Sequence, residues 1–133
     1  MLIRDVDDGF EVFMLQRTYG AAFAGGMYVF PGGKVDATDG AEALEPFCDG
    51  LNDFEASAIL QIPSGGLAYW VAAIRECFEE AGVLLARDTK TNRTVAFDDD
   101  ATQDRFAHAR RSVHDSSLDM IELCQRENLR LVT

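Results

Sequence analysis

Apolar and acidic residues follow a helical period between residues 66 and 81. At about 100° per residue, Glu76, Glu79 and Glu80 occupy positions i, i+3 and i+4 and share one flank. The opposite flank is apolar and carries Leu67, Trp70, Val71, Ile74, Cys77, Phe78 and Ala81. Such a stripe is typical of a helix packed on a core. The pattern therefore predicts a central helix over residues 66–81, and Gly82 suits the left-handed position that ends a helix.

The segment before this helix has the alternating pattern of β-strands. We expect strands over residues 1–5, 10–17 and 27–30. The sequence Asp7-Asp8-Gly9 between the first two strands predicts a hairpin. Apolar residues occur at both alternating positions of residues 10–17, so this strand is expected to be buried on much of both faces.

Small residues and glycines separate these strands from the rest of the chain. A loop is expected over residues 19–26, and Pro31-Gly32-Gly33 ends the third strand. Glycine permits backbone conformations closed to other residues and lets the main chain approach a ligand closely. The alternative for Gly32 and Gly33 is an ordinary tight turn.

Two short helices are predicted between Gly33 and the central helix. They cover residues 41–47 and 53–62, and Asn52 is a plausible N-cap of the second. After the central helix, residues 83–86 are expected to form a buried extended segment.

The C-terminal third has the pattern of two more helices. The first is predicted over residues 101–114, and the second runs through residue 127 with Ser116 or Ser117 as its cap. His108 and His114 are not spaced with other metal ligands and are interpreted as surface residues. The pair Arg110-Arg111 is interpreted as helix surface, with a phosphate contact as the alternative.

Composition and charge indicate what kind of domain this is and which binding partners are unfavourable for it. The chain has 133 residues, 47% of them hydrophobic, which predicts one globular domain over residues 1–133. Its net charge of −11, from 23 acidic and 12 basic residues, argues against binding to nucleic acid or to an anionic membrane surface. The three cysteines show no C-x-x-C pair, so reduced thiols in a cytoplasmic protein are expected.

Three carboxylates on one helix flank repel one another, and a bound cation would offset this repulsion. Like charges at i, i+4 destabilise an isolated helix by a few tenths of a kcal/mol. A hard divalent cation such as Mg²⁺ would bind all three of Glu76, Glu79 and Glu80, because it prefers carboxylate oxygens and often bridges protein to phosphate. The alternative is a solvated glutamate-rich helix face, and the carboxylates alone leave both interpretations open.

The residues around these glutamates resemble the Nudix box. Arg75-Glu76-Cys77-Phe78-Glu79-Glu80-Ala81-Gly82-Val83 matches the second half of that motif at every fixed position, and Gly33 with Asp39 supplies the first half. Asp39 replaces the glutamate that is usual in the family. The 35 residues between Asp39 and Arg75 are far more than the usual spacer. An insertion at this place, here residues 37–65, resembles the branch of the peroxisomal coenzyme A diphosphatases.

This resemblance implies a fold, a reaction and a set of site residues. The fold would be α+β, a Nudix-like mixed β-sheet packed between helices. The reaction would be hydrolysis of a nucleoside diphosphate linked to another moiety, such as coenzyme A or a related nucleotide. Mg²⁺ or Mn²⁺ would bind Glu79, Glu80 and the Gly33 carbonyl, with Glu76 as a further ligand or as the base for water. Arg75 would orient the glutamates, and Asp39 would support the geometry of loop and helix.

The resemblance also implies further strands after Thr133, so the sheet is expected to be incomplete at its C-terminus. An incomplete sheet would expose an edge and apolar surface, which predicts a homodimer or higher oligomer. Two functions stay open on the sequence. One is a working diphosphohydrolase of small-molecule substrates. The other is a catalytically incomplete Nudix-like fragment that serves as an interaction or assembly module.

Overall fold

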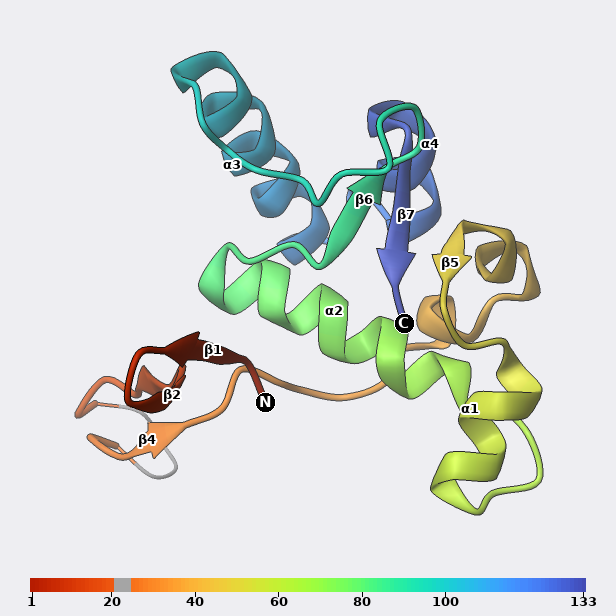
Figure 1. Ribbon diagram of the computed structural model, residues 1–133, viewed down its shortest axis with the longest axis horizontal. Coiled ribbons are helices and arrows are strands. Elements are labelled where there is room, and N and C mark those ends of the chain that lie inside the picture. The colour runs from red at the N-terminus through yellow and green to blue at the C-terminus, as the bar shows by residue number, and fades with distance from the viewer. Residues whose placement is uncertain (21–24) are drawn as a thin grey trace.

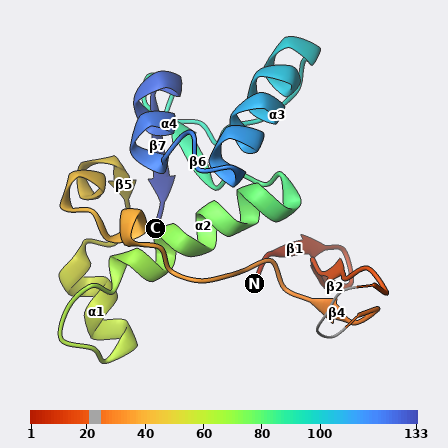
Figure 2. The same ribbon diagram turned by 180° about the vertical axis from the view of Figure 1, so that it is seen from behind.

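The central helix is the element around which the other segments are arranged. The computed structural model describes residues 1–20 and 25–133. Helix α2 (Leu67–Ala81) crosses the middle of the molecule, with the C-terminal helices and sheet on one side of it and the N-terminal hairpins on the other (Figures 1 and 2). Gly82 adopts φ 70° and ends the helix, which confirms the predicted helix and its left-handed cap.

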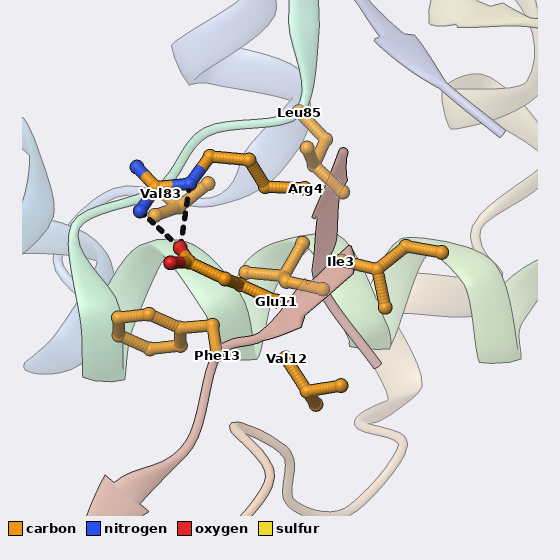
Figure 3. Close-up of a pocket in the computed structure, with 8 residues that line it drawn as sticks. Ile3, Arg4, Glu11, Val12, Phe13, Val83 and Leu85 are labelled. Carbon is orange, nitrogen blue, oxygen red and sulfur yellow. Dashed lines mark hydrogen bonds and ion pairs between the residues drawn. The ribbon is translucent and has the colours of Figure 1, made fainter. Parts of the chain in front are cut away.

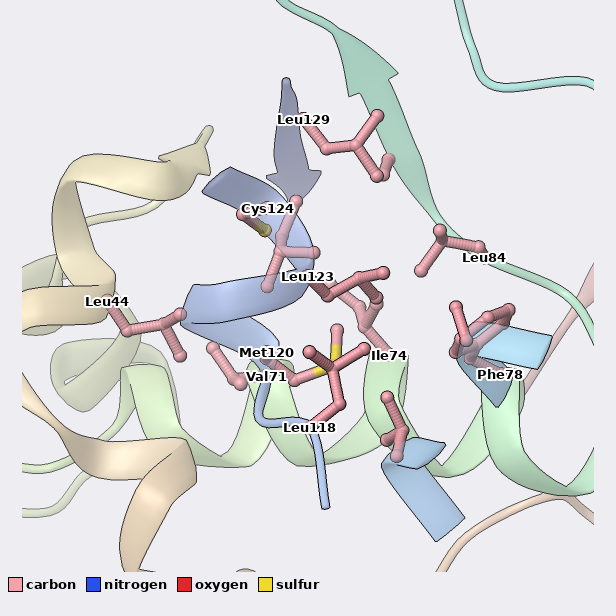
Figure 4. Packing of buried hydrophobic residues seen from close by; sticks show 14 of the residues in the cluster. Leu44, Val71, Ile74, Phe78, Leu84, Leu118, Met120, Leu123, Cys124 and Leu129 are labelled. Atoms are coloured by element: carbon pink, nitrogen blue, oxygen red, sulfur yellow. The ribbon is translucent and has the colours of Figure 1, made fainter. Parts of the chain in front are cut away.

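The apolar flank of α2 forms the centre of the core. It packs against α4 (Met120–Glu127) and the C-terminal sheet (Figure 4). The largest fully buried side chains come from the insertion, α2, α4 and the last strand: Leu44, Val71, Phe78, Leu123, Cys124 and Leu131. Burying this apolar surface is the main driving force that holds these elements together.

The C-terminal sheet is mixed and has three strands. Strand β7 (Leu129–Val132) lies in the middle, parallel to β5 (Cys48–Asp49) and antiparallel to β6 (Ala86–Asp88). Leu129 and Leu131 are buried whereas their neighbours are exposed, so one face covers the core. Residues 83–86 are expected to form a buried strand or extended segment. Strand pairing begins at Ala86, and Leu84 and Ala86 are buried.

The C-terminal residues of the chain are hydrogen-bonded to two neighbouring segments. The amide of Thr133 donates to the Asp49 carbonyl at 3.2 Å, and that of Val132 donates to the Leu85 carbonyl at 3.0 Å. The last strand is thus hydrogen-bonded on both sides, because β5 from the insertion occupies its second edge.

The N-terminal strands form two separate hairpins. Strands β1 (Ile3–Val6) and β2 (Gly9–Val12) pair across the predicted turn, and β3 (Leu15–Gln16) pairs with β4 (Tyr28–Val29). The expected strand over residues 10–17 is therefore interrupted. Its expected burial on both faces is wrong: the Phe10 side chain is 66% exposed, because neither hairpin joins the C-terminal sheet. The loop expected over residues 19–26 lies partly outside the described residues.

The insertion is part of the core and supports α2. It forms the 3₁₀ helices η1 (Ala37–Gly40) and η2 (Glu42–Phe47), strand β5, and α1 (Asp53–Leu60). Asn52 caps α1 through a bond from the Glu55 amide, as predicted.

The N-terminus of α2 receives its caps from α1. The Asp53 carboxylate accepts bonds from the amides of Gly65 and Leu67, each at 3.0 Å. The Ser57 hydroxyl accepts a third from Gly66 at 2.9 Å. These bonds satisfy amides that a helix N-terminus cannot pair internally. Residues 53–57 therefore position the helix that carries the glutamates.

Leu44→Ala is expected to destabilise the protein by about 2–5 kcal/mol, the usual cost of emptying a buried leucine site. Leu44 is 1% exposed although it lies within the insertion. Ile59→Ala, at a 59% exposed position of α1, is the matched control and should cost far less. Urea unfolding measures both. Equal effects of the two changes would show that the insertion does not contribute to the core.

The remaining helices lie beside the end of α2. Helix α3 (Asp100–His114) begins after Asp99, whose carboxylate accepts from the Thr102 amide. Helix α4 is capped by Asp119 and not by the predicted Ser116 or Ser117, because Ser116 has φ 60° and lies in the preceding turn. The α+β class is confirmed. Among the described residues, no helix has the length and apolarity needed to cross a membrane.

Candidate functional site

A buried ion pair lies at the centre of the candidate site. The Arg75 guanidinium donates from Nε to Asp39 Oδ1 at 2.9 Å and from Nη2 to Asp39 Oδ2 at 3.0 Å. Asp39 is 2% exposed and Arg75 is also buried. This two-point geometry is the strong form of an arginine–carboxylate contact. It joins η1 of the insertion to the middle of α2, across the long spacer of the sequence.

The rest of the Arg75 guanidinium binds the glutamate flank. Nη1 donates to Glu76 Oε1 at 2.9 Å and to Glu79 Oε1 at 2.8 Å. Nη2 donates to the Lys34 carbonyl at 2.8 Å. The hydrogen bonds that Arg75 donates to Asp39 are the main cause that raises the pKa of the Arg75 guanidinium above its ordinary value. Arg75 thus remains charged and holds two carboxylates side by side.

The glycine loop lies directly against the glutamates. The Gly32 amide donates to Glu80 Oε2 at 2.9 Å. A Cβ atom at position 33 would overlap the Glu76 carboxylate, so only glycine permits the observed approach. The expected close approach of the main chain is therefore present at the glutamates of α2.

Burial and like charge act together on Glu76. Desolvation is the largest cause that raises the pKa of the Glu76 carboxyl above its ordinary value, and Glu79 and Glu80 add to it. Arg75 opposes the shift without cancelling it. A bound cation would favour the charged form of all three carboxylates.

The donor set suits a hard divalent cation, although the side chains are not arranged around one. Within residues 1–20 and 25–133, no three His, Cys, Asp or Glu side chains are arranged to hold a metal ion together. Glu76 and Glu79 each direct one oxygen to Arg75. The carboxylates of Glu76, Glu79 and Glu80 and the main chain of Gly33 nevertheless gather in one place, and oxygen donors are those that Mg²⁺ and Mn²⁺ prefer. The residues therefore fit such an ion by the chemistry of their oxygen donors, although in this arrangement they do not surround one.

A cavity of about 540 Å³ opens beside the glutamate flank. Its walls come from η1, α2 and the turn between α3 and α4, and include Asp36, Glu76, Glu79, His114 and Asp119. The turn between α3 and α4 forms one wall of this cavity, which could not be predicted from the motif.

Two residues of α3 contact the site and were not expected to do so. Arg110 donates to the main-chain carbonyls of Glu79 and Glu80, each at 2.8 Å. His114 Nδ1 lies 3.3 Å from Glu79 Oε2, although its ring is exposed. The four-residue spacing of Arg110 and His114 shows that they share a helix face. Only the packing of α3 on α2 shows which element that face meets.

Comparison with known proteins agrees with the motif. The chain is 35% identical to human Acyl-coenzyme A diphosphatase NUDT19 over 103 aligned residues, which cover 60% of this chain and 28% of the relative. It is 33% identical to the protein of the same name from Gallus gallus over 96 residues, which cover 57% of this chain and 25% of the relative. The match thus spans about a quarter of the length of these relatives. No family model matches the chain, and neither does any solved structure.

Both relatives are named as diphosphatases of an acyl-coenzyme A, the branch that the interrupted box of this sequence resembles. The similarity is that of a partial Nudix-like chain. The resemblance to the coenzyme A diphosphatase branch of the Nudix hydrolases is therefore confirmed for the matched part of this chain.

Proposed function

We propose that this chain carries the metal-dependent site of a diphosphohydrolase. Its substrates would be nucleoside diphosphates linked to another moiety, with coenzyme A derivatives as the leading class. The observation that carries the proposal is the contact of the Gly32-Gly33 loop with Glu76 and Glu80 on α2. The printed names of the two relatives support the choice of coenzyme A derivatives.

Each residue of the site has a role in this proposal. Glu79, Glu80 and the Gly33 carbonyl would hold Mg²⁺ or Mn²⁺, and Glu76 would be a further ligand or take the proton of the attacking water. The ion would neutralise charge that develops on phosphoryl oxygens. Arg75 orients Glu76 and Glu79, since its Nη1 contacts both. Water adds to one phosphorus of the anhydride, one P–O bond breaks, and two phosphomonoesters leave.

A panel of substrates tests the proposal. The purified chain is incubated with coenzyme A, an acyl-coenzyme A, ADP-ribose and NADH, each with Mg²⁺, with Mn²⁺ or with EDTA. The expected result is metal-dependent release of phosphomonoester products, fastest for the coenzyme A compounds. A chain that binds Mn²⁺ yet releases no product from any compound would contradict hydrolysis.

A second candidate function is supported by the exposed apolar surface of the hairpins. An apolar groove of about 630 Å³ lies between the β1–β2 hairpin and residues 83–85, lined by Ile3, Val12, Phe13, Val83 and Leu85 (Figure 3). Arg4 and Glu11 also line the groove and form an ion pair with each other. An assembly module that uses this surface would need no turnover. A cytoplasmic homodimer, in which a second copy covers the groove, is the form we propose for it.

A homodimer is expected at micromolar concentration. Large exposed apolar patches on a soluble protein are typical of interaction sites, and Phe10, Met27 and Tyr28 are each at least 60% exposed. Sedimentation velocity should show a dimer that Phe13→Lys, in the lining of the groove, shifts toward monomer. Phe54→Lys, at an 83% exposed position of α1, is the matched control. A wild-type monomer at all concentrations would contradict the assembly module and leave the hydrolase proposal standing.

A further inference from the structure

Helix α3 contacts the part of α2 that carries two of the glutamates. The Arg110 guanidinium reaches across with two bonds of 2.8 Å, from Nε to the Glu79 carbonyl and from Nη2 to the Glu80 carbonyl. Both acceptors belong to residues whose side chains form the carboxylate flank. Arg110 therefore fixes the main chain of both glutamates at once.

These two carbonyls need a partner from outside α2. The last four carbonyls of a helix have no amide partner within it. At the end of α2, the Gly82 amide pairs with the Phe78 carbonyl and the Val83 amide pairs with the Cys77 carbonyl. Arg110 supplies donors to the next two carbonyls, and a cation at a helix C-terminus is also favoured by the helix dipole.

Gly82 makes room for this arrangement. A Cβ atom there would lie 3.3 Å from Arg110 Nη1, a tight contact. The residue also has φ 70°, which glycine adopts at little cost. The glycine that ends the Nudix box thus serves both the turn and the approach of the Arg110 guanidinium.

The side chain of Glu79 is held from the same helix. His114 lies one turn after Arg110, and its Nδ1 is 3.3 Å from Glu79 Oε2. An ionised carboxylate can only accept, so this contact is a hydrogen bond when His114 carries a proton on Nδ1. Arg75 Nη1 binds the other carboxylate oxygen of Glu79 at 2.8 Å. Glu79 is therefore fixed at both carboxylate oxygens and at its main-chain carbonyl.

We propose that Arg110 is a positioning residue for the metal-ligating glutamates Glu79 and Glu80, and that His114 assists it at Glu79. The proposal rests on the proposed function, because it assigns these glutamates to a divalent cation. Partners that orient metal ligands typically change metal affinity by about 10- to 100-fold when they are removed. A helix cap without this role would change stability alone.

Titration of the full chain with Mn²⁺, followed by EPR in the absence of substrate, tests the proposal. Arg110→Gln is expected to raise the Mn²⁺ dissociation constant by about 10- to 100-fold. Arg110→Lys should recover part of the affinity, because one ammonium can still reach a carbonyl. His114→Gln should weaken binding less than Arg110→Gln does. Arg111→Gln, at the exposed neighbouring position of the same helix, is the matched control and should leave the affinity unchanged.

Urea unfolding of the same variants separates positioning from a purely structural role. Arg110→Gln with lowered stability but wild-type Mn²⁺ affinity would overturn the proposal. If Arg110→Gln does not fold, unchanged affinity in both Arg110→Lys and His114→Gln would overturn it equally. A wild-type chain that fails to bind Mn²⁺ would overturn the proposed metal site and this inference together. Wild-type binding with unchanged variants would overturn the role of Arg110 alone.

Discussion

Glu79→Gln and Glu80→Gln are each expected to abolish Mg²⁺-supported hydrolysis while leaving the fold intact. A neutral amide oxygen replaces a charged carboxylate ligand poorly for a hard cation. The loss should exceed the roughly 10- to 100-fold that removal of an outer partner costs. Neither side chain is fully buried, so circular dichroism and thermal unfolding should stay close to wild type. The rate of phosphomonoester release at saturating substrate is the measurement.

A third glutamine variant provides the control. Glu122 is an exposed glutamate of α4, outside the site, and Glu122→Gln should retain wild-type turnover. Wild-type turnover in Glu79→Gln or in Glu80→Gln would show that the metal assignment is wrong for that residue. Because all three changes remove one negative charge, net charge alone cannot explain a difference between them.

Asp39→Asn is expected to lower the unfolding free energy by about 3 kcal/mol, the lower end of the range for breaking a buried ion pair. The amide would place donors against the donors of Arg75, which the Asp39 carboxylate now binds at two points. Arg75 would keep its contacts to Glu76, Glu79 and the Lys34 carbonyl. Because Arg75 keeps these contacts, we expect a loss of unfolding free energy at the lower end of that range. Urea unfolding at neutral pH measures the change.

The matched control for Asp39 is an exposed aspartate beside the same guanidinium. Asp36 Oδ2 lies 3.5 Å from Arg75 Nη2, and its side chain is 62% exposed. Exposed ion pairs contribute about 0–1 kcal/mol, so Asp36→Asn should change stability little. If the two asparagine variants unfold at the same urea concentration, burial of the Asp39–Arg75 pair does not stabilise the fold.

The Asp39–Arg75 pair also holds together the two segments that resemble the halves of the Nudix box. They are separated by 35 residues, yet the pair brings η1 and α2 into direct contact. The aspartate that departs from the family's usual glutamate reaches Arg75 from a 3₁₀ turn, where its carboxylate also accepts from the Asp36 amide at 2.8 Å.

Local patterns determined the helices and the position of the glutamates. The period of apolar residues gave the bounds of α2 to within one residue, and Gly82 marked its end. The three glutamates share a flank because their spacing matches the helical repeat. The Asp7-Asp8-Gly9 turn and the Asn52 cap could also be predicted from the sequence, because turns and caps depend on residues a few positions apart.

Tertiary packing decided the features that depend on distant partners. Alternation could not show that the hairpins remain exposed, because burial depends on which elements come to cover a strand. Nor could it place residues 129–132 in the middle of a sheet, since their neighbour β5 comes from the insertion. Two supports of the glutamate flank could not be predicted for the same reason: Arg110 and His114 reach Glu79 from α3, and both lie more than 30 residues away from it in the sequence. The sequence thus set the carboxylate chemistry through local spacing, whereas the contacts that orient it arise only when the chain folds.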